Sequence, residues 1–268
     1  MPAIQPARLK KQALDLAAKF DNPAAFVREL HSLLDRYTDH THRSGQAGEP
    51  FPLVSAYNTP PPVIRQVWVE LIQQAKAHPE GILPLCDALW AEPNFDLQLL
   101  ATRLLGQASV VPIAPILERV HAWVGTGLNK RLLDGLLIYG LEQLRLRDPA
   151  QVLSLVSDWL NSRDLSLQQS GLHALVILSN YPGIENLPSV LKLITPYVRT
   201  APSRLKPDIL ALLTVLAHTS PSETAYLLRQ NLAAPDNPDT AWIIRQVLEE
   251  FPEDTRSTLR VAMKGMTK

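Results

Sequence analysis

The feature that most constrains this chain is a helical apolar period that repeats along most of its length. Beyond residue 62, apolar residues recur every three or four positions in stretches of about 12 to 15 residues, each ended by Pro, Gly, Asn or Ser. The ten stretches are residues 63–77, 81–91, 96–106, 111–124, 129–144, 150–161, 165–179, 187–199, 204–218 and 222–232. Two more follow residue 239. With two helices before residue 40, the pattern predicts an all-α fold of about 12 to 14 helices.

The composition agrees with helices packed on helices. Hydrophobic residues make up 46% of the chain and aromatic residues only 6%, and Leu, Ala and Val dominate. Such residues suit helix packing better than sheets. The 23 prolines fall mostly between the apolar stretches, where proline opens or stops a helix.

Weak internal similarity indicates repeats. Residues 88–101 (Ala-Leu-Trp-Ala-Glu-Pro-Asn-Phe-Asp-Leu-Gln-Leu-Leu-Ala) align with residues 158–171, and residues 187–213 repeat the pattern. A helix, a short polar turn and a second helix with small central residues form a unit that buries its faces only by stacking on neighbours. We therefore predict an α-solenoid of stacked antiparallel helix pairs of the HEAT type. Tetratricopeptide repeats fit less well, because their Trp, Gly and Tyr positions are missing.

The domain prediction follows the same pattern. Residues 1–43 should form an N-terminal helical hairpin, with helices at 5–20 and 23–37; Asn22 and Pro23 stand in the order that a helix start prefers. Residues 44–62 lack the helical apolar period, which predicts an irregular linker. Residues 63–268 form the HEAT-like repeat body, and we expect all three parts to make one continuous domain.

The charge balance and the search for targeting segments limit the partners and the compartment that we expect. The chain has 26 Lys and Arg and 26 Asp and Glu, so any nucleic-acid site must be a local patch. The single cysteine, Cys86, lies in an apolar run, which predicts a buried thiol and excludes an intramolecular disulfide. No N-terminal apolar segment and no membrane-spanning stretch is evident. We expect a soluble cytoplasmic protein, monomeric and without a membrane partner.

Several common catalytic signatures are missing from the sequence. It has no phosphate-binding Gly-rich loop, His-Glu-x-x-His, paired Cys ligands or Gly-x-Ser-x-Gly elbow. His31, His40 and His42 form either a metal site or a solvated helix end, and the second interpretation is favoured, so we predict no metal and no cofactor. The tryptophans lie on apolar faces and are expected in the core. They are Trp68, Trp90, Trp123, Trp159 and Trp242.

One charged run stands out. Residues 129–134 (Asn-Lys-Arg-Leu-Leu-Asp) begin a helix behind Gly125 and Gly127, and they place two cations where the helix dipole favours acids. The run is either a solvated first turn or a phosphate-contact patch with an acid behind it.

The order of features resembles the DNA alkylation repair glycosylases built from HEAT-like repeats, the AlkD-like family, over most of residues 55–220. Residues 59–65 (Thr-Pro-Pro-Pro-Val-Ile-Arg) are similar to that family's proline-led start of a helix. Leu89 and Trp90, followed by residues 95–101 (Phe-Asp-Leu-Gln-Leu-Leu-Ala), are similar to its Leu-Trp, His-Glu-x-Arg and Ala pattern.

The resemblance also implies a site. The family's helix start Asn-Trp-Asp-x-x-Asp falls on residues 129–134, so Asp134 matches the catalytic carboxylate that stabilises positive charge on the sugar and orients water. Lys130 replaces the tryptophan, and its charge would repel a cationic base. Gln169 and Leu210 stand where the family has an arginine and a second tryptophan. The resemblance is therefore to a diverged member.

These observations lead to one favoured function and two alternatives. We expect the protein to bind the DNA backbone of duplex, damaged or branched DNA through a local basic patch, with weak or lost glycosylase activity. The candidate contacts are Arg65, Arg103, Lys130, Arg131, Arg204 and Lys206. One alternative is an active DNA N-glycosylase for alkylated bases that uses Asp134 and stacks the base on Trp123 or Tyr139. The other is a protein-binding HEAT scaffold without a nucleic-acid role.

Overall fold

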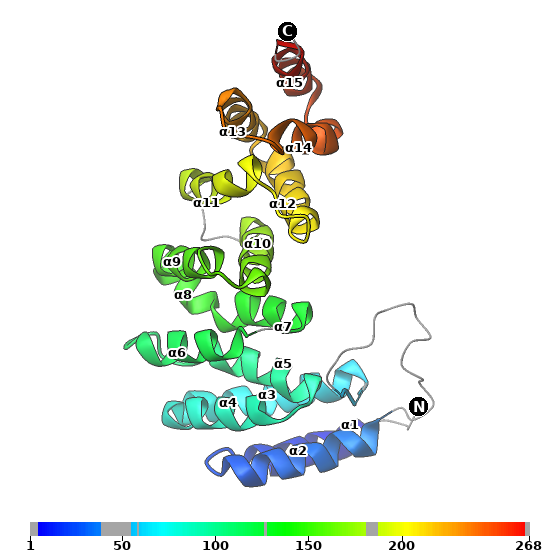
Figure 1. Cartoon of the computed structure of the whole chain (residues 1–268). Helices are drawn as coiled ribbons and strands as arrows, with labels where there is room; N and C mark the ends of the chain where they lie inside the picture. Colours follow the sequence, from blue (N-terminus) through cyan, green and yellow to red (C-terminus); the bar gives the residue numbers. More distant parts are fainter. Residues whose placement is uncertain (1–4, 39–54, 58, 126–127, 181–186, 266–268) are drawn as a thin grey trace. The chain divides into compact units, whose positions relative to one another are not determined.

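The computed structural model describes residues 5–38, 55–57, 59–125, 128–180 and 187–265. In these residues the chain forms fifteen α-helices, two short 3-10 turns and one π-helical turn (Figure 1). The described part contains no β-strand beyond an isolated bridge between Ser55 and Asn94. The predicted all-α, HEAT-like fold is confirmed.

The chain divides into two compact units, which are described separately. Unit 1 comprises residues 1–123 and 128–143, and unit 2 comprises residues 124–127 and 144–268. The predicted division into hairpin, linker and one continuous repeat body stays a prediction.

The helices of unit 1 pack on one another in pairs. Its helices are α1 (Pro6–Ala17), α2 (Pro23–Tyr37), α3 (Pro61–Ala77), α4 (Ile82–Ala91), α5 (Phe95–Leu105), α6 (Ala114–Trp123) and α7 (Lys130–Gly135), with a 3-10 turn at Pro79–Gly81 and the π-helical turn at Leu136–Gly140. Helix α1 contacts α2 and α3, α4 contacts α2 and α5, and α5 contacts α7 and the π turn. The apolar faces predicted from the period meet in these contacts.

Capping residues explain where the helices begin. Asn22 accepts a hydrogen bond from the Ala25 N–H, and Pro23 opens α2 at the predicted residue. Asn94 accepts from the N–H groups of Asp96 and Leu97 at the start of α5.

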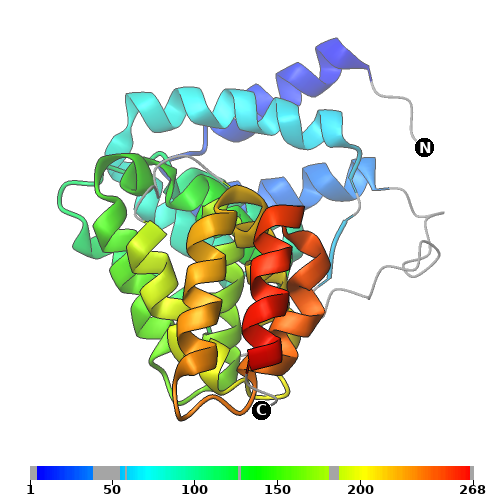
Figure 2. The same cartoon turned by 90° about the horizontal axis from the view of Figure 1, so that it is seen from above.

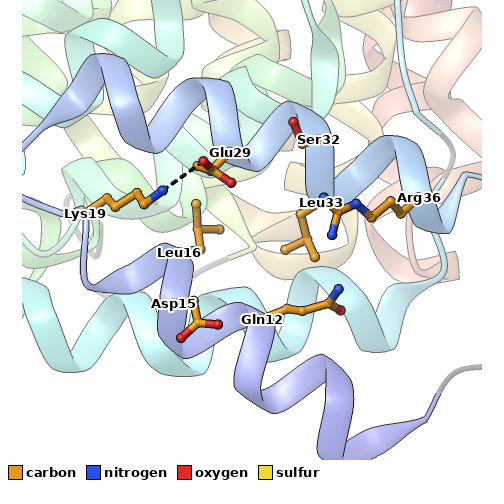
Figure 3. A pocket seen from close by; sticks show the side chains of 8 residues that line it. All are labelled: Gln12, Asp15, Leu16, Lys19, Glu29, Ser32, Leu33 and Arg36. Carbon is orange, nitrogen blue, oxygen red and sulfur yellow. Dashed lines mark ion pairs between the residues drawn. The ribbon is translucent and has the colours of Figure 1, made fainter.

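Between α1 and α2 a shallow pocket of about 120 Å³ is lined by both helices, and the ion pair of Lys19 and Glu29 crosses it with 2.8 Å between Nζ and Oε1 (Figure 3).

Unit 2 contains two rows of stacked helices. Its helices are α9 (Pro149–Leu160), α10 (Leu165–Ser179), α11 (Leu187–Arg199), α12 (Lys206–Thr219), α13 (Pro221–Ala233), α14 (Thr240–Val247) and α15 (Glu253–Gly265), with a 3-10 turn at Leu248–Glu250; α8 (Glu142–Arg147) leads into it. In one row α9, α11, α13 and α15 contact in succession, and in the other α10, α12 and α14 do so. Figure 2 shows α13, in orange, beside α15, in red. Such rows are the HEAT arrangement.

A small residue allows the two rows to approach closely. A Cβ on Gly171 of α10 would lie 2.8 Å from the Leu160 side chain at the end of α9. This is the role that the sequence pattern predicts for small residues near the centre of the second helix of a pair.

The predicted single helix at 129–144 is wrong, because the segment is divided. Helix α7 ends at Gly135, the π turn follows, and α8 starts at Glu142. The Leu141 N–H donates to the Leu136 carbonyl at 2.9 Å, the wider spacing of a π turn. Gly140 brings this turn against α5, since a Cβ there would lie 3.1 Å from the Thr102 carbonyl oxygen. Apolar residues continue through the turn, so the period does not reveal it.

The described end of the predicted linker is held by α5. The Phe95 N–H donates to the Ser55 carbonyl at 2.8 Å, and the Tyr57 N–H donates to Asp96 Oδ2 at 2.7 Å. Residues 39–54 lie outside the described part, and with them His40 and His42. Among the described residues, no group of three or more His, Cys, Asp or Glu side chains could hold a metal ion.

Two further predictions concern burial. Cys86 is fully buried, as expected, and burial raises the pKa of its thiol. Of the tryptophans, Trp123 and Trp159 are buried, whereas Trp68, Trp90 and Trp242 are half-buried.

No helix in the described ranges combines the length and the apolar character that crossing a membrane requires.

Candidate nucleic-acid interface

The first turn of α7 presents two exposed cations. The Asn129 side chain accepts a hydrogen bond from the Arg131 N–H at 2.9 Å and so caps the helix. Lys130 and Arg131 follow the cap, and both are exposed. Cations at a helix N-terminus oppose the helix dipole, so the helix itself gains nothing from their charge.

Asp134 shares a helix face with these cations. It lies four residues after Lys130 and three after Arg131, the spacings that place side chains on one face, and it is half-buried. A ligand group that reaches the carboxylate therefore also meets positive charge from the first turn. The residues for which the sequence predicts a phosphate patch and a catalytic acid are thus neighbours on one surface.

Arg131 is held by α5. Its guanidinium carbon lies 5.0 Å from the centroid of the Phe95 ring, a cation–π contact. It also acts on Asp96: burial raises the pKa of that carboxyl group, while the Tyr57 N–H hydrogen bond and the Arg131 charge lower it. Phe95 and Asp96, at the start of α5, therefore help to position Arg131. The sequence pattern does not identify them as its contacts.

Two residues that the sequence analysis names separately come together in unit 1. The guanidinium carbon of Arg103, on α5, lies 5.0 Å from the ring centroid of Tyr139, on the π turn. Arg103 is a predicted DNA contact, and Tyr139 is a predicted stacking residue. Arg65, a further predicted DNA contact on α3, is exposed.

Trp123 lies in a different environment. It is 7% exposed, and its indole ring stacks on that of Trp90 with centroids 4.3 Å apart. Of the two stacking candidates, Tyr139 is the one with an exposed ring, at 41%.

The cations of unit 2 have other surroundings. Lys206 Nζ lies 3.1 Å from Asp239 Oδ1 and 4.3 Å from the ring centroid of Trp242, so its charge is already compensated. Arg204, two residues earlier, is exposed. The two residues are close in sequence but differ in their availability to a phosphate.

Gln169 has a buried partner. Its Nε2 donates to Asp208 Oδ2 at 2.7 Å, and Asp208, in the first turn of α12, is 4% exposed. Leu210, two residues further on, is half-buried. Asp208 is not among the residues predicted from the sequence, although an acid directly after Lys206 and Pro207 is typical of a helix start.

The fold and this surface define an all-α, HEAT-like repeat protein with exposed cations and a half-buried carboxylate at the start of one helix. A family model described as DNA alkylation repair enzyme matches residues 51–257. The chain belongs to this family of DNA alkylation repair enzymes. Comparisons with curated proteins and with solved structures give no significant match.

Proposed function

We propose that this protein binds DNA through exposed cations of unit 1 and has weak or lost glycosylase activity. Family membership supports DNA as the partner class. The observation that carries the rest is the shared helix face of Lys130, Arg131 and Asp134.

Electrostatics explains why this face favours the backbone over a cationic lesion. A phosphate is attracted to Lys130 and Arg131, and neutralising phosphates supplies most of the affinity of non-specific DNA binding. An alkylated base that carries positive charge is repelled by the same side chains. They also offset the field with which Asp134 would stabilise positive charge on the sugar, so base release should be slow.

The binding test is a fluorescence anisotropy titration at low and physiological salt. The probes are an undamaged duplex, a duplex with an abasic-site analogue and a branched junction. We expect binding that weakens with salt, and a Lys130→Ala, Arg131→Ala variant that binds less tightly. The slope of log K against log salt should fall by about 1 for each phosphate that the variant no longer neutralises.

The matched control is the variant Lys10→Ala, Lys11→Ala. It removes the same charge from two adjacent exposed residues of α1 in the same unit. If both variants lose the same DNA affinity, the loss depends on net charge alone and not on the position of the cations. This result would contradict the proposed patch. Absence of binding at low salt would reject DNA binding and leave the protein-binding scaffold.

The second test measures release of bases from a methylated duplex. We expect the wild type and an Asp134→Asn variant both to stay near the background rate, while the variant binds DNA at least as tightly because a negative charge is gone. Fast release by the wild type that Asp134→Asn abolishes would instead support an active N-glycosylase.

A further inference from the structure

A pocket in unit 1 combines aromatic, cationic and acidic side chains. Its volume is about 370 Å³, within the range of small-molecule sites. It is lined by Trp68, Ile72, Arg103, Gln107, Tyr139 and Glu142. These residues come from α3, the end of α5 and the segment that follows α7, and all of them belong to unit 1.

The pocket offers flat surfaces for stacking. Trp68 is half-buried and Tyr139 is 41% exposed, so both rings present surface to a ligand. The Arg103 guanidinium lies over the Tyr139 ring, and guanidinium groups also stack on planar bases.

The pocket also offers hydrogen-bonding groups of both kinds. Arg103 carries donors only, Glu142 carries acceptors when ionised, and Gln107 carries both. Within the part of the chain that the structure describes, Nε of Arg103 is buried and has no hydrogen-bond partner. This N–H donor of Arg103 is therefore not satisfied by the protein itself.

Backbone packing fixes the arginine and the tyrosine relative to each other. A Cβ on Gly106 would clash with the Tyr139 carbonyl oxygen, so the end of α5 and the π turn touch at this glycine. Arg103 and Tyr139 lie on these two segments. A π turn inside a helical segment is often found at a functional site.

We infer that this pocket binds an unpaired nucleobase, and the inference rests on the proposed function because DNA supplies the base. A nucleobase is flat and aromatic and carries donors and acceptors on its edge, which matches two rings, a donor and an acceptor. A phosphate fits less well, because Glu142 would repel it. An apolar ligand would leave the charged groups without partners.

The test compares a fully paired duplex with the same duplex carrying one unpaired guanine. We expect the wild type to prefer the bulged duplex, and Tyr139→Ala to reduce affinity for the bulge by about 5- to 150-fold, the range for loss of one base–aromatic stack, without changing affinity for the paired duplex. Tyr139→Phe keeps the ring and should keep the preference. Tyr226→Ala, on a residue 60% exposed in unit 2, is the matched control and should change neither.

A second readout uses 2-aminopurine as the unpaired base. Stacking on Tyr139 should quench its fluorescence in the wild type and in Tyr139→Phe, but not in Tyr139→Ala. Glu142 lies at the exposed edge of the pocket. A Glu142→Gln variant should still fold, and it should change the ratio of the affinities for the guanine-bulged duplex and the paired duplex.

The outcomes separate the inference from the proposed function. Equal binding of paired and bulged duplexes by the wild type overturns the inference and leaves the proposed function standing. Failure to bind either duplex overturns both. Titration with dGMP distinguishes the source of the base: Tyr139-dependent binding of dGMP without a bulge preference would assign the pocket to a free nucleotide and overturn the DNA assignment.

Discussion

The indole rings of Trp90 and Trp123 stack nearly parallel, with centroids 4.3 Å apart and planes inclined by 10°. Trp90 lies at the end of α4 and Trp123 ends α6, so the stack joins two helices that are not consecutive. Stacked aromatic pairs add to the free energy of burial. The contact places Trp123 in the interior of unit 1.

We therefore expect Trp123→Ala to lower the free energy of unfolding by about 3–5 kcal/mol, as for other buried aromatic truncations. Chemical unfolding followed by circular dichroism measures it. Tyr226→Ala removes an exposed ring and should change stability by no more than about 0.5 kcal/mol. Unchanged stability of Trp123→Ala together with weaker DNA binding would show that this tryptophan contacts the ligand instead.

Gly106→Ala should destabilise the protein. The added Cβ would clash with the Tyr139 carbonyl oxygen, so the π turn must move, at a cost of about 1–3 kcal/mol typical of overpacking. Gly125→Ala is the control, because a Cβ there meets nothing within 4 Å. Equal midpoints for the two variants in urea unfolding would contradict the contact between α5 and the π turn.

Asp96 should make stability depend on pH. Burial raises its pKa above the ordinary value of 3.8, and the Tyr57 N–H and Arg131 only partly offset this. A raised pKa in the folded state means that the carboxyl group favours folding below its unfolded pKa and loses that contribution as pH rises through the folded pKa. Asp96→Asn should thus gain stability relative to the wild type as the pH rises above about 4, the ordinary pKa of an aspartate. A difference that does not change with pH in urea unfolding would refute this.

The phenol of Tyr197 should ionise only at strongly alkaline pH. Burial raises its pKa to about 12, and its hydroxyl donates to the Leu160 carbonyl at 2.7 Å. Its contribution to stability is complete below about pH 10 and is lost as pH rises through the folded pKa. Absorbance titration at alkaline pH should show one late phenol that Tyr197→Phe removes. The same variant should cost about 0.5–1.5 kcal/mol at neutral pH because the hydrogen bond is removed.

Much of the fold was predictable because its signals are local. Helix α2 begins at Pro23 behind the Asn22 cap, and α10 spans the predicted 165–179 behind Asp164, whose side chain accepts from the Ser166 N–H. Caps and apolar period act within a few residues, so the sequence displays them directly. The π turn escaped prediction because it depends on contacts of Gly135 and Gly140 with α5.

The candidate site was predictable only in part. Lys130, Arg131 and Asp134 share a face because helical spacing alone places them there. The contact of Arg131 with Phe95, and the ion pair that occupies Lys206, join residues distant in sequence and depend on packing. Single cations in a sequence carry no information about which of them already has a partner.

By itself the sequence determined the helical class, most helix boundaries and the resemblance to a DNA repair family, because period, caps and motif spacing are properties of neighbouring residues. Tertiary structure alone decided that Arg103 meets Tyr139 beside Trp68, and that Trp123 is buried against Trp90. Those relationships arise when helices separated along the chain pack together, and side-chain volume and backbone approach at glycines select the contacts.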